Sequence, residues 1–171
     1  GIVNVIDIVA QVNFIMEGGE CDECGDTVEL FGQTYDVETT TQLYLCPDFQ
    51  SLPNQSQIPP EIGCLVNLET LVAANCLIVG EIPAELGNLI NLVELELENN
   101  HLEGGIPIEL ANLTNLQYFD LENNHLDGDI PQSVKDLIIY INSIDDSYVS
   151  LIENPLNETE WINENACGDC L

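Results

Sequence analysis

Positive charge is almost missing from this chain. Its 171 residues hold 31 Asp and Glu against a single basic side chain, Lys135. Such a surface repels phosphate backbones, which proteins bind through Lys and Arg, so we expect no nucleic-acid partner and no attraction to anionic membranes. Cations and basic proteins are the partners that this charge favours. The alternative is that the acids only keep the protein soluble at high ionic strength.

Long apolar runs and catalytic motifs are missing as well. No stretch of about 18 apolar residues is present, which predicts no membrane span. There is no Ser/His/Asp constellation, no phosphate-cradling glycine loop and no HExxH motif, so we expect no enzymatic activity. The chain begins at Gly1 without a signal peptide, and we therefore expect a mature or excised part of a larger protein.

Two consecutive stretches match each other position by position. Residues 82–105 read IPAELGNLINLVELELENNHLEGG and residues 106–129 read IPIELANLTNLQYFDLENNHLDGD, so the period is 106 − 82, about 24 residues. A period of about 20 to 29 residues is typical of leucine-rich repeats. Both stretches resemble the plant-type subclass of that family, LxxLxLxxNxLxGxIPxxLxxL. The resemblance implies an α/β solenoid with a parallel β-sheet on its concave face and a cap at each end.

Each repeat predicts one strand. In LVELELENNHL, leucines at alternate positions predict a buried face, and the glutamates between them predict a solvent face. Stacked repeats bury such leucines together at a strand spacing of about 4.8 Å. The resemblance also implies that Asn100 and Asn124 form an internal ladder, in which their amides satisfy buried backbone groups. Cys76 replaces this Asn in the preceding repeat, and we expect it to be a buried free thiol.

The remaining pattern divides the chain into segments. VELFGQTYDV predicts a hairpin around Gly32, because short β-rich runs flank the glycine. The cap that contains it is similar to those of secreted bacterial leucine-rich-repeat proteins. IPQSV starts a final repeat, and VKDLIIYINSIDDS is an insertion before YVSLIENPL restores the strand and its Asn. The predicted segments are a short amphipathic helix at 1–18, the cap and first strand at 19–57, repeats at 58–157 and a C-terminal tail at 158–171.

The opening residues GIVNVID resemble the second half of a dockerin-type calcium loop, a relative of the EF-hand. Gly1, Asn4 and Asp7 stand at the offsets of loop positions six, nine and twelve, whereas the earlier acidic ligands of such a loop are missing. The alternative is a helix that packs its apolar face against a neighbouring domain, another copy of the chain or the first repeat.

Seven cysteines include two CxxC pairs, Cys21/Cys24 and Cys167/Cys170. A solenoid holds its two ends too far apart for one zinc ion, so we expect disulfides in the caps and an oxidising compartment. His101 and His125 share an offset in successive repeats, which predicts that they stack about 5 Å apart. They are interpreted as exposed turn residues, with a pair of transition-metal ligands as the alternative.

The side chains between the strand leucines form the predicted concave face, which is the family's usual ligand surface. Carboxylates fill its centre, and like charges on neighbouring strands are destabilising, so a basic partner, a divalent cation or salt should compensate them. Aromatic and apolar side chains beside the acids suit recognition. The candidate ligand-binding residues are Thr70, Val72, Glu94, Glu96, Glu98, Tyr118, Asp120, Glu122 and Tyr148. The alternative ligand is calcium, the only cofactor that the sequence suggests, which Asn4, Asp7, Glu96 and Asp120 would bind.

The sequence therefore favours a secreted or cell-surface bacterial module that binds a protein or peptide, with a basic partner preferred. Two alternatives remain open. One is a structural or assembly subunit of cell-surface material that self-associates through the N-terminal helix. The other is glycan adhesion, with Tyr44, Tyr118 and Tyr148 as aromatic platforms.

Overall fold

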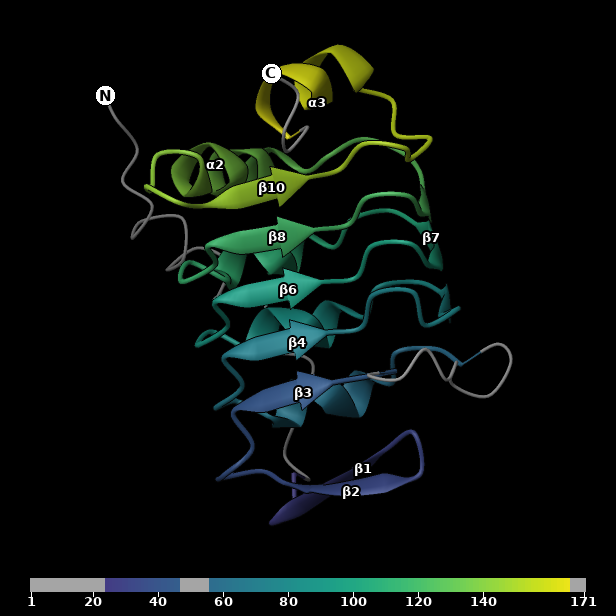
Figure 1. Cartoon of the computed structure of the whole chain (residues 1–171), viewed down its shortest axis with the longest axis vertical. Helices are drawn as coiled ribbons and strands as arrows, with labels where there is room; N and C mark the ends of the chain where they lie inside the picture. The colour runs from purple at the N-terminus through teal and green to yellow at the C-terminus, as the bar shows by residue number, and fades with distance from the viewer. Residues whose placement is uncertain (1–23, 47–55, 167–171) are drawn as a thin grey trace.

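A parallel β-sheet runs along the whole solenoid (Figure 1). The computed structural model describes residues 24–46 and 56–166. The sheet has five strands in the order β10-β8-β6-β4-β3, so each strand lies beside the strand of the next repeat. Its strands are β3 (Gln42–Tyr44), β4 (Thr70–Val72), β6 (Glu94–Glu96), β8 (Tyr118–Asp120) and β10 (Tyr148–Ser150).

The predicted alternation is confirmed in β6 and β8, whereas Thr70 in β4 and Ser150 in β10 are buried on the side expected to face solvent. Leu71, Leu95 and Phe119, the central residues of β4, β6 and β8, are fully buried. In β6, the residues on either side of Leu95 are only partly buried. The register places Leu71 beside Leu95 and Leu95 beside Phe119. One column of apolar side chains therefore continues from repeat to repeat and forms the core of the solenoid.

Short 3-10 helices lie behind the sheet (Figure 1). They are η1 (Pro60–Cys64), η2 (Ala84–Asn88) and η3 (Ile108–Asn112). Each begins directly after the proline of an Ile-Pro pair, whose extended backbone precedes the first turn. The helices pack closely, since a Cβ on Gly63 would lie 2.6 Å from the Glu85 carbonyl oxygen.

A second, smaller sheet covers one flank. Its strands β5 (Val79–Gly80), β7 (His101–Gly104) and β9 (His125–Leu126) are parallel and lie in the order β5-β7-β9. Gly80 and Gly104 end β5 and β7 with φ of +83° and +76°, a conformation that a side chain would strain. These glycines turn the chain from the flank into the next Ile-Pro segment.

The asparagine ladder expected from the resemblance is confirmed. Asn124 Nδ2 donates to the carbonyl oxygens of Leu97 (3.0 Å) and Leu121 (3.1 Å), and its Oδ1 accepts from the Leu102 N–H (3.0 Å). Asn100 and Asn154 make the equivalent bonds one repeat before and one repeat after. Backbone groups at the end of each strand are thus satisfied inside the solenoid.

The N-terminal end is closed by the predicted hairpin. Strands β1 (Thr27–Leu30) and β2 (Gln33–Asp36) pair antiparallel around Gly32, whose φ is +77°. Leu30 is fully buried against the first repeat. A disulfide between Cys24 and Cys64 ties the hairpin to η1.

The C-terminal end has the final strand and ladder Asn that the sequence predicts, and the segments interpreted as an insertion and a tail contain helices. Helix α2 (Gln132–Ile141) takes the place of a 3-10 helix and buries Val134, Leu137 and Ile141. Helix α3 (Thr159–Asn165) lies over the last strand, where the Leu151 N–H donates to the Ala166 carbonyl (2.8 Å). These two helices cover the core that the last repeat would otherwise expose.

The prediction of a free thiol at Cys76 is wrong. Cys76 is fully buried, as expected, but forms a disulfide with Cys46, whose Cα lies 5.8 Å away. The chain leaves β3 with a left-handed residue at Cys46 (φ +58°), which directs it toward the ladder position. Cys21, Cys167 and Cys170, the predicted helix at 1–18 and the dockerin-like Asn4 and Asp7 lie outside the described residues.

Candidate functional site

The solvent side of the five-stranded sheet brings most of the candidate residues together in rows. The first row runs Thr70, Glu94, Tyr118, Tyr148, and the second runs Val72, Glu96, Asp120, Ser150. Backbone bonds from the Asn75 N–H to Glu98 O and from the Asn99 N–H to Glu122 O continue the register into a third row. We call the surface formed by these rows the acidic sheet face.

The residues of these rows differ in how much of their surface is accessible to a ligand. Tyr118 is exposed, with 41% of its surface accessible, and Tyr148, Val72 and the five carboxylates are partly buried. Thr70 is only 8% exposed, so it belongs to the floor of the face. Ser150 is fully buried and donates through Oγ to Glu122 Oε2 (2.9 Å).

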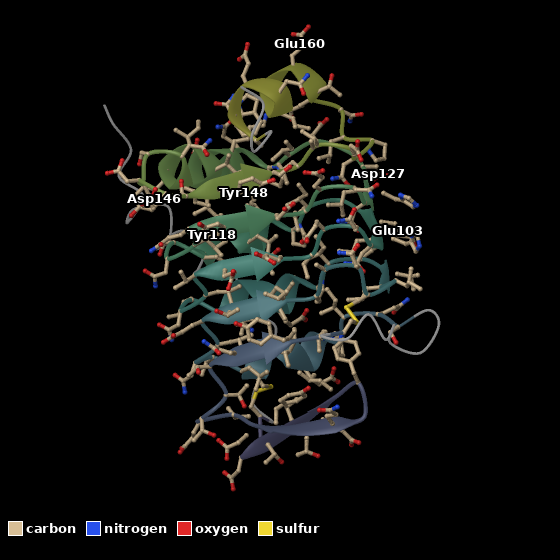
Figure 2. The ribbon with its side chains drawn as sticks, viewed as in Figure 1. Glu103, Tyr118, Asp127, Asp146, Tyr148 and Glu160 are labelled. Carbon is tan, nitrogen blue, oxygen red and sulfur yellow. A yellow bond between two sulfur atoms is a disulfide. The ribbon has the colours of Figure 1, made fainter. Side chains whose placement is uncertain are left out.

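Tyr118 and Tyr148 stack on each other. Their ring centroids are 6.5 Å apart and their planes make an angle of 21°. They lie on the two neighbouring strands at the C-terminal part of the sheet (Figure 2). Rings at this distance attract each other and form a rigid aromatic surface, with an apolar face and a polar hydroxyl rim.

The carboxylates in the middle of the face are hard to ionise together. Burial, followed by the negative charges of Glu98 and Glu94, raises the pKa of Glu96 to about 7. Burial and the charges of Glu98 and Glu122 raise the pKa of Asp120 to about 6, although the hydrogen bond from the Glu122 N–H acts in the opposite direction. Part of the face is therefore protonated near neutral pH.

Glu98 carries the most isolated oxygen of this group. Its Oε2 is buried and accepts no hydrogen bond from the described residues. Burial raises the pKa of Glu98, and the charge of Glu122 in the neighbouring repeat adds to the effect. A cation placed here would stabilise the ionised form of Glu98.

A preformed metal cage is not present in the part of the chain that the structure describes, where no three His, Cys, Asp or Glu side chains converge. Glu96 and Asp120 do face each other in register, as the calcium alternative expects. Calcium binding at these residues stays a prediction.

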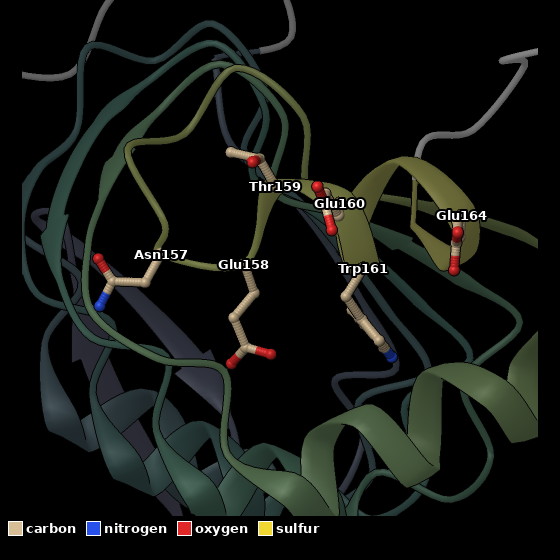
Figure 3. A pocket seen from close by; sticks show the side chains of 6 residues that line it. All are labelled: Asn157, Glu158, Thr159, Glu160, Trp161 and Glu164. Carbon is tan, nitrogen blue, oxygen red and sulfur yellow. The ribbon is translucent and has the colours of Figure 1, made fainter.

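Two further places lie outside the acidic sheet face. His101 and His125 lie at about the predicted spacing, with ring centroids 5.5 Å apart, but their rings are tilted by 43° and do not stack. At the C-terminal cap, a hollow of about 570 Å³ is lined by one face of α3 and the residues before it (Figure 3). The sequence predicted a tail there and missed Trp161, whose ring points to the same side as the Glu158 carboxylate in Figure 3.

Comparison with known proteins agrees with the geometry. The family model described as Leucine Rich Repeat matches residues 67–89, 91–113 and 115–137. The fold is a leucine-rich-repeat solenoid of the plant type. No curated protein matches the chain significantly. Within the described residues, no helix combines the length and the apolar character that crossing a bilayer requires.

Solved structures of receptors share the repeats. The LRR ectodomain of the receptor kinase GASSHO1/SCHENGEN3 from Arabidopsis thaliana, in complex with CASPARIAN STRIP INTEGRITY FACTOR 2, is 40% identical over 60% of this chain, with a TM-score of 0.53. The Arabidopsis receptor kinase HAESA, in complex with the peptide hormone IDA and the co-receptor SERK1, is 32% identical over 68%, with a TM-score of 0.57. A TDR receptor is 32% identical over 73%, with a TM-score of 0.57. The chain spans only 12%, 18% and 20% of these structures.

Proposed function

We propose that the acidic sheet face binds an extended, basic segment of a protein or peptide. The observation that carries this proposal is that the stacked Tyr118 and Tyr148 lie in the row next to that of Glu96 and Asp120 on the same sheet. Tyrosine gives contact area at low entropic cost, and a Lys or Arg side chain from the partner can lie over a ring while it reaches the carboxylates.

Charge complementarity supports a cationic partner. Burial, and after it the repulsion among five carboxylates on adjacent repeats, raises the pKa values of Glu96, Glu98 and Asp120. The only base of the chain, Lys135, is engaged with Glu158 at the C-terminal cap. A basic partner would supply compensating charge, and it would be attracted over a long range.

Two of the similar structures are complexes with a peptide hormone or a named factor, which supports a peptide or protein as the partner class. The disulfides Cys24–Cys64 and Cys46–Cys76 support an oxidising compartment, and hence a secreted or cell-surface location. The bacterial origin suggested by the cap, and the dockerin-like start, stay predictions.

Selection from a displayed library of random peptides tests the proposal. We expect the selected peptides to be enriched in Lys, Arg and aromatic residues, and their binding to weaken as salt is raised. The double variant Glu96→Gln/Asp120→Asn should reduce affinity at least about tenfold. The matched control Glu85→Gln/Glu109→Gln removes the same charge from η2 and η3 behind the sheet and should change affinity little. Equal effects of the two variants would contradict the proposal.

Each of the alternative functions has its own test. Self-association through residues 1–18 predicts a mass that rises with concentration in light scattering. Calcium at the carboxylates predicts a rise in melting temperature with calcium that magnesium at matched ionic strength does not produce. Glycan adhesion would use Tyr44, which is 52% exposed but lies on β3, across β4 and β6 from Tyr118. The three tyrosines therefore do not form one platform.

A further inference from the structure

Two imidazoles lie side by side on the second sheet. His101 begins β7 and His125 begins β9, and their ring centroids are 5.5 Å apart with an angle of 43° between the planes. Both side chains are exposed. The register pairs His125 with Glu103, so the two histidines lie on neighbouring strands without being directly opposite each other, and their rings come together from there.

Two carboxylates share this face. Leu102 and Leu126 are fully buried, so the alternation of the strands turns the residues on either side of them toward solvent. Glu103 follows on β7 and Asp127 follows β9, and both are exposed. Figure 2 shows Glu103 and Asp127 one above the other on the flank of the solenoid, away from Tyr118 and Tyr148.

We propose that His101 and His125 together bind one divalent transition-metal ion, copper(II) in preference to nickel(II) and zinc(II), with water at the remaining positions. Metal–nitrogen bonds are about 2.0 to 2.1 Å long, which places the centroids of two imidazoles on one ion on the order of 5 Å apart. The observed separation already has this size, so the rings need only to rotate.

The surroundings favour a dication of this class. The chain has a formal net charge of −30, which raises the concentration of cations at its surface. Imidazole selects copper, nickel and zinc over calcium and magnesium, which prefer oxygen ligands. Since no third His, Cys, Asp or Glu converges on the pair among the described residues, Glu103 and Asp127 act here through their charge and not as ligands.

Copper(II) titration of the full chain, followed by electron paramagnetic resonance in excess magnesium, tests the site. Magnesium occupies the carboxylates, and nitrogen hyperfine coupling reports imidazole ligands. We expect one equivalent of copper to show coupling to two nitrogens. His101→Gln and His125→Gln should each lower the affinity at least about tenfold, and the double variant should lose the nitrogen signal.

The matched variant Glu103→Gln/Asp127→Asn should keep the nitrogen signal and weaken binding less than either histidine variant does. Zinc titration with NMR detection of the imidazole nitrogens should shift both histidines together in the unmodified chain, which makes the test independent of how well a variant folds. Copper bound only by oxygen, nitrogen coupling that persists without both histidines, or a shift of one imidazole alone would overturn the proposal.

Discussion

Lys135 and Glu158 form an ion pair that joins α2 to the residue preceding α3. The side chains are only 15% and 26% exposed. The other carboxylate oxygen of Glu158 accepts from the Ile130 N–H (3.2 Å), and the Lys135 ammonium lies 5.5 Å from the centroid of the Trp161 ring. The single base of this acidic chain is thus placed where it closes the C-terminal cap.

Replacing Lys135 by Met should therefore destabilise the cap. The substitution leaves the Glu158 carboxylate partly buried without its partner, which we expect to cost about 1–2 kcal/mol and to lower the melting temperature by about 2–8 °C. Thermal unfolding measures the effect. Asp145→Asn, at an exposed position beyond α2, serves as the control and should change little. A Lys135→Met protein as stable as the parent would show that the pair contributes nothing.

Asn124→Ala should be among the most damaging polar substitutions. It leaves buried backbone groups of Leu97, Leu102 and Leu121 without their side-chain partner, for which we expect a loss of about 2–4 kcal/mol in chemical denaturation. Asn115→Ala removes one exposed bond, to the Ile90 carbonyl (2.8 Å), and should cost about 1 kcal/mol or less. Similar losses in both variants would argue against the ladder.

The repeats were predictable because each depends on residues that recur. Leu95 and Asn100 occupy positions that recur from repeat to repeat and face the interior of the solenoid. The pattern in two repeats is therefore enough to predict how all the repeats stack. The hairpin around Gly32 was predictable for a local reason, since a left-handed residue is needed between the two short strands.

The structure of the two ends of the solenoid was harder to predict from the sequence, because the contacts made there do not repeat. Helix α2 left a signal in Val134, Leu137, Ile138 and Ile141, which recur at helical spacing, but the segment interrupts a strand pattern and was interpreted as an insertion. The register places Cys46 level with Ala74, so its disulfide with Cys76 depends on a bend that the sequence does not show. The burial of Thr70 and Ser150 likewise depends on their neighbours in the folded sheet.

The disulfide between Cys24 and Cys64 should hold the N-terminal hairpin in place. It links residues 40 apart in the sequence, so Cys24→Ser/Cys64→Ser should cost about 2–4 kcal/mol. Hydrogen–deuterium exchange should show that β1 and β2 lose protection first, while β6 and β8 keep theirs. Uniform loss of protection along the solenoid would contradict this local role.

Stability should fall as the pH rises through the pKa values of the sheet carboxylates. The pKa values of Glu96 (about 7) and Asp120 (about 6) in the folded protein lie above those of the unfolded chain. The protonated forms therefore stabilise the fold below about pH 4, and this contribution is lost as the pH rises to about 7.

Glu96→Gln isolates the contribution of one such group. Because Glu96 is partly exposed, we expect the variant to gain about 1 kcal/mol, or about 2–4 °C in melting temperature, at about pH 8 and little at about pH 4. Glu85→Gln on η2 is the control for general charge repulsion. A gain independent of pH, or the same gain in both variants, would contradict the assignment.

The most direct test of peptide binding on the acidic sheet face is hydrogen–deuterium exchange with and without a peptide selected from the library. The account predicts added protection in β6, β8 and β10 and in the residues that follow them, with η1, η2 and η3 unchanged. Protection confined to the 3-10 helices or to the flank of β7 and β9 would contradict it.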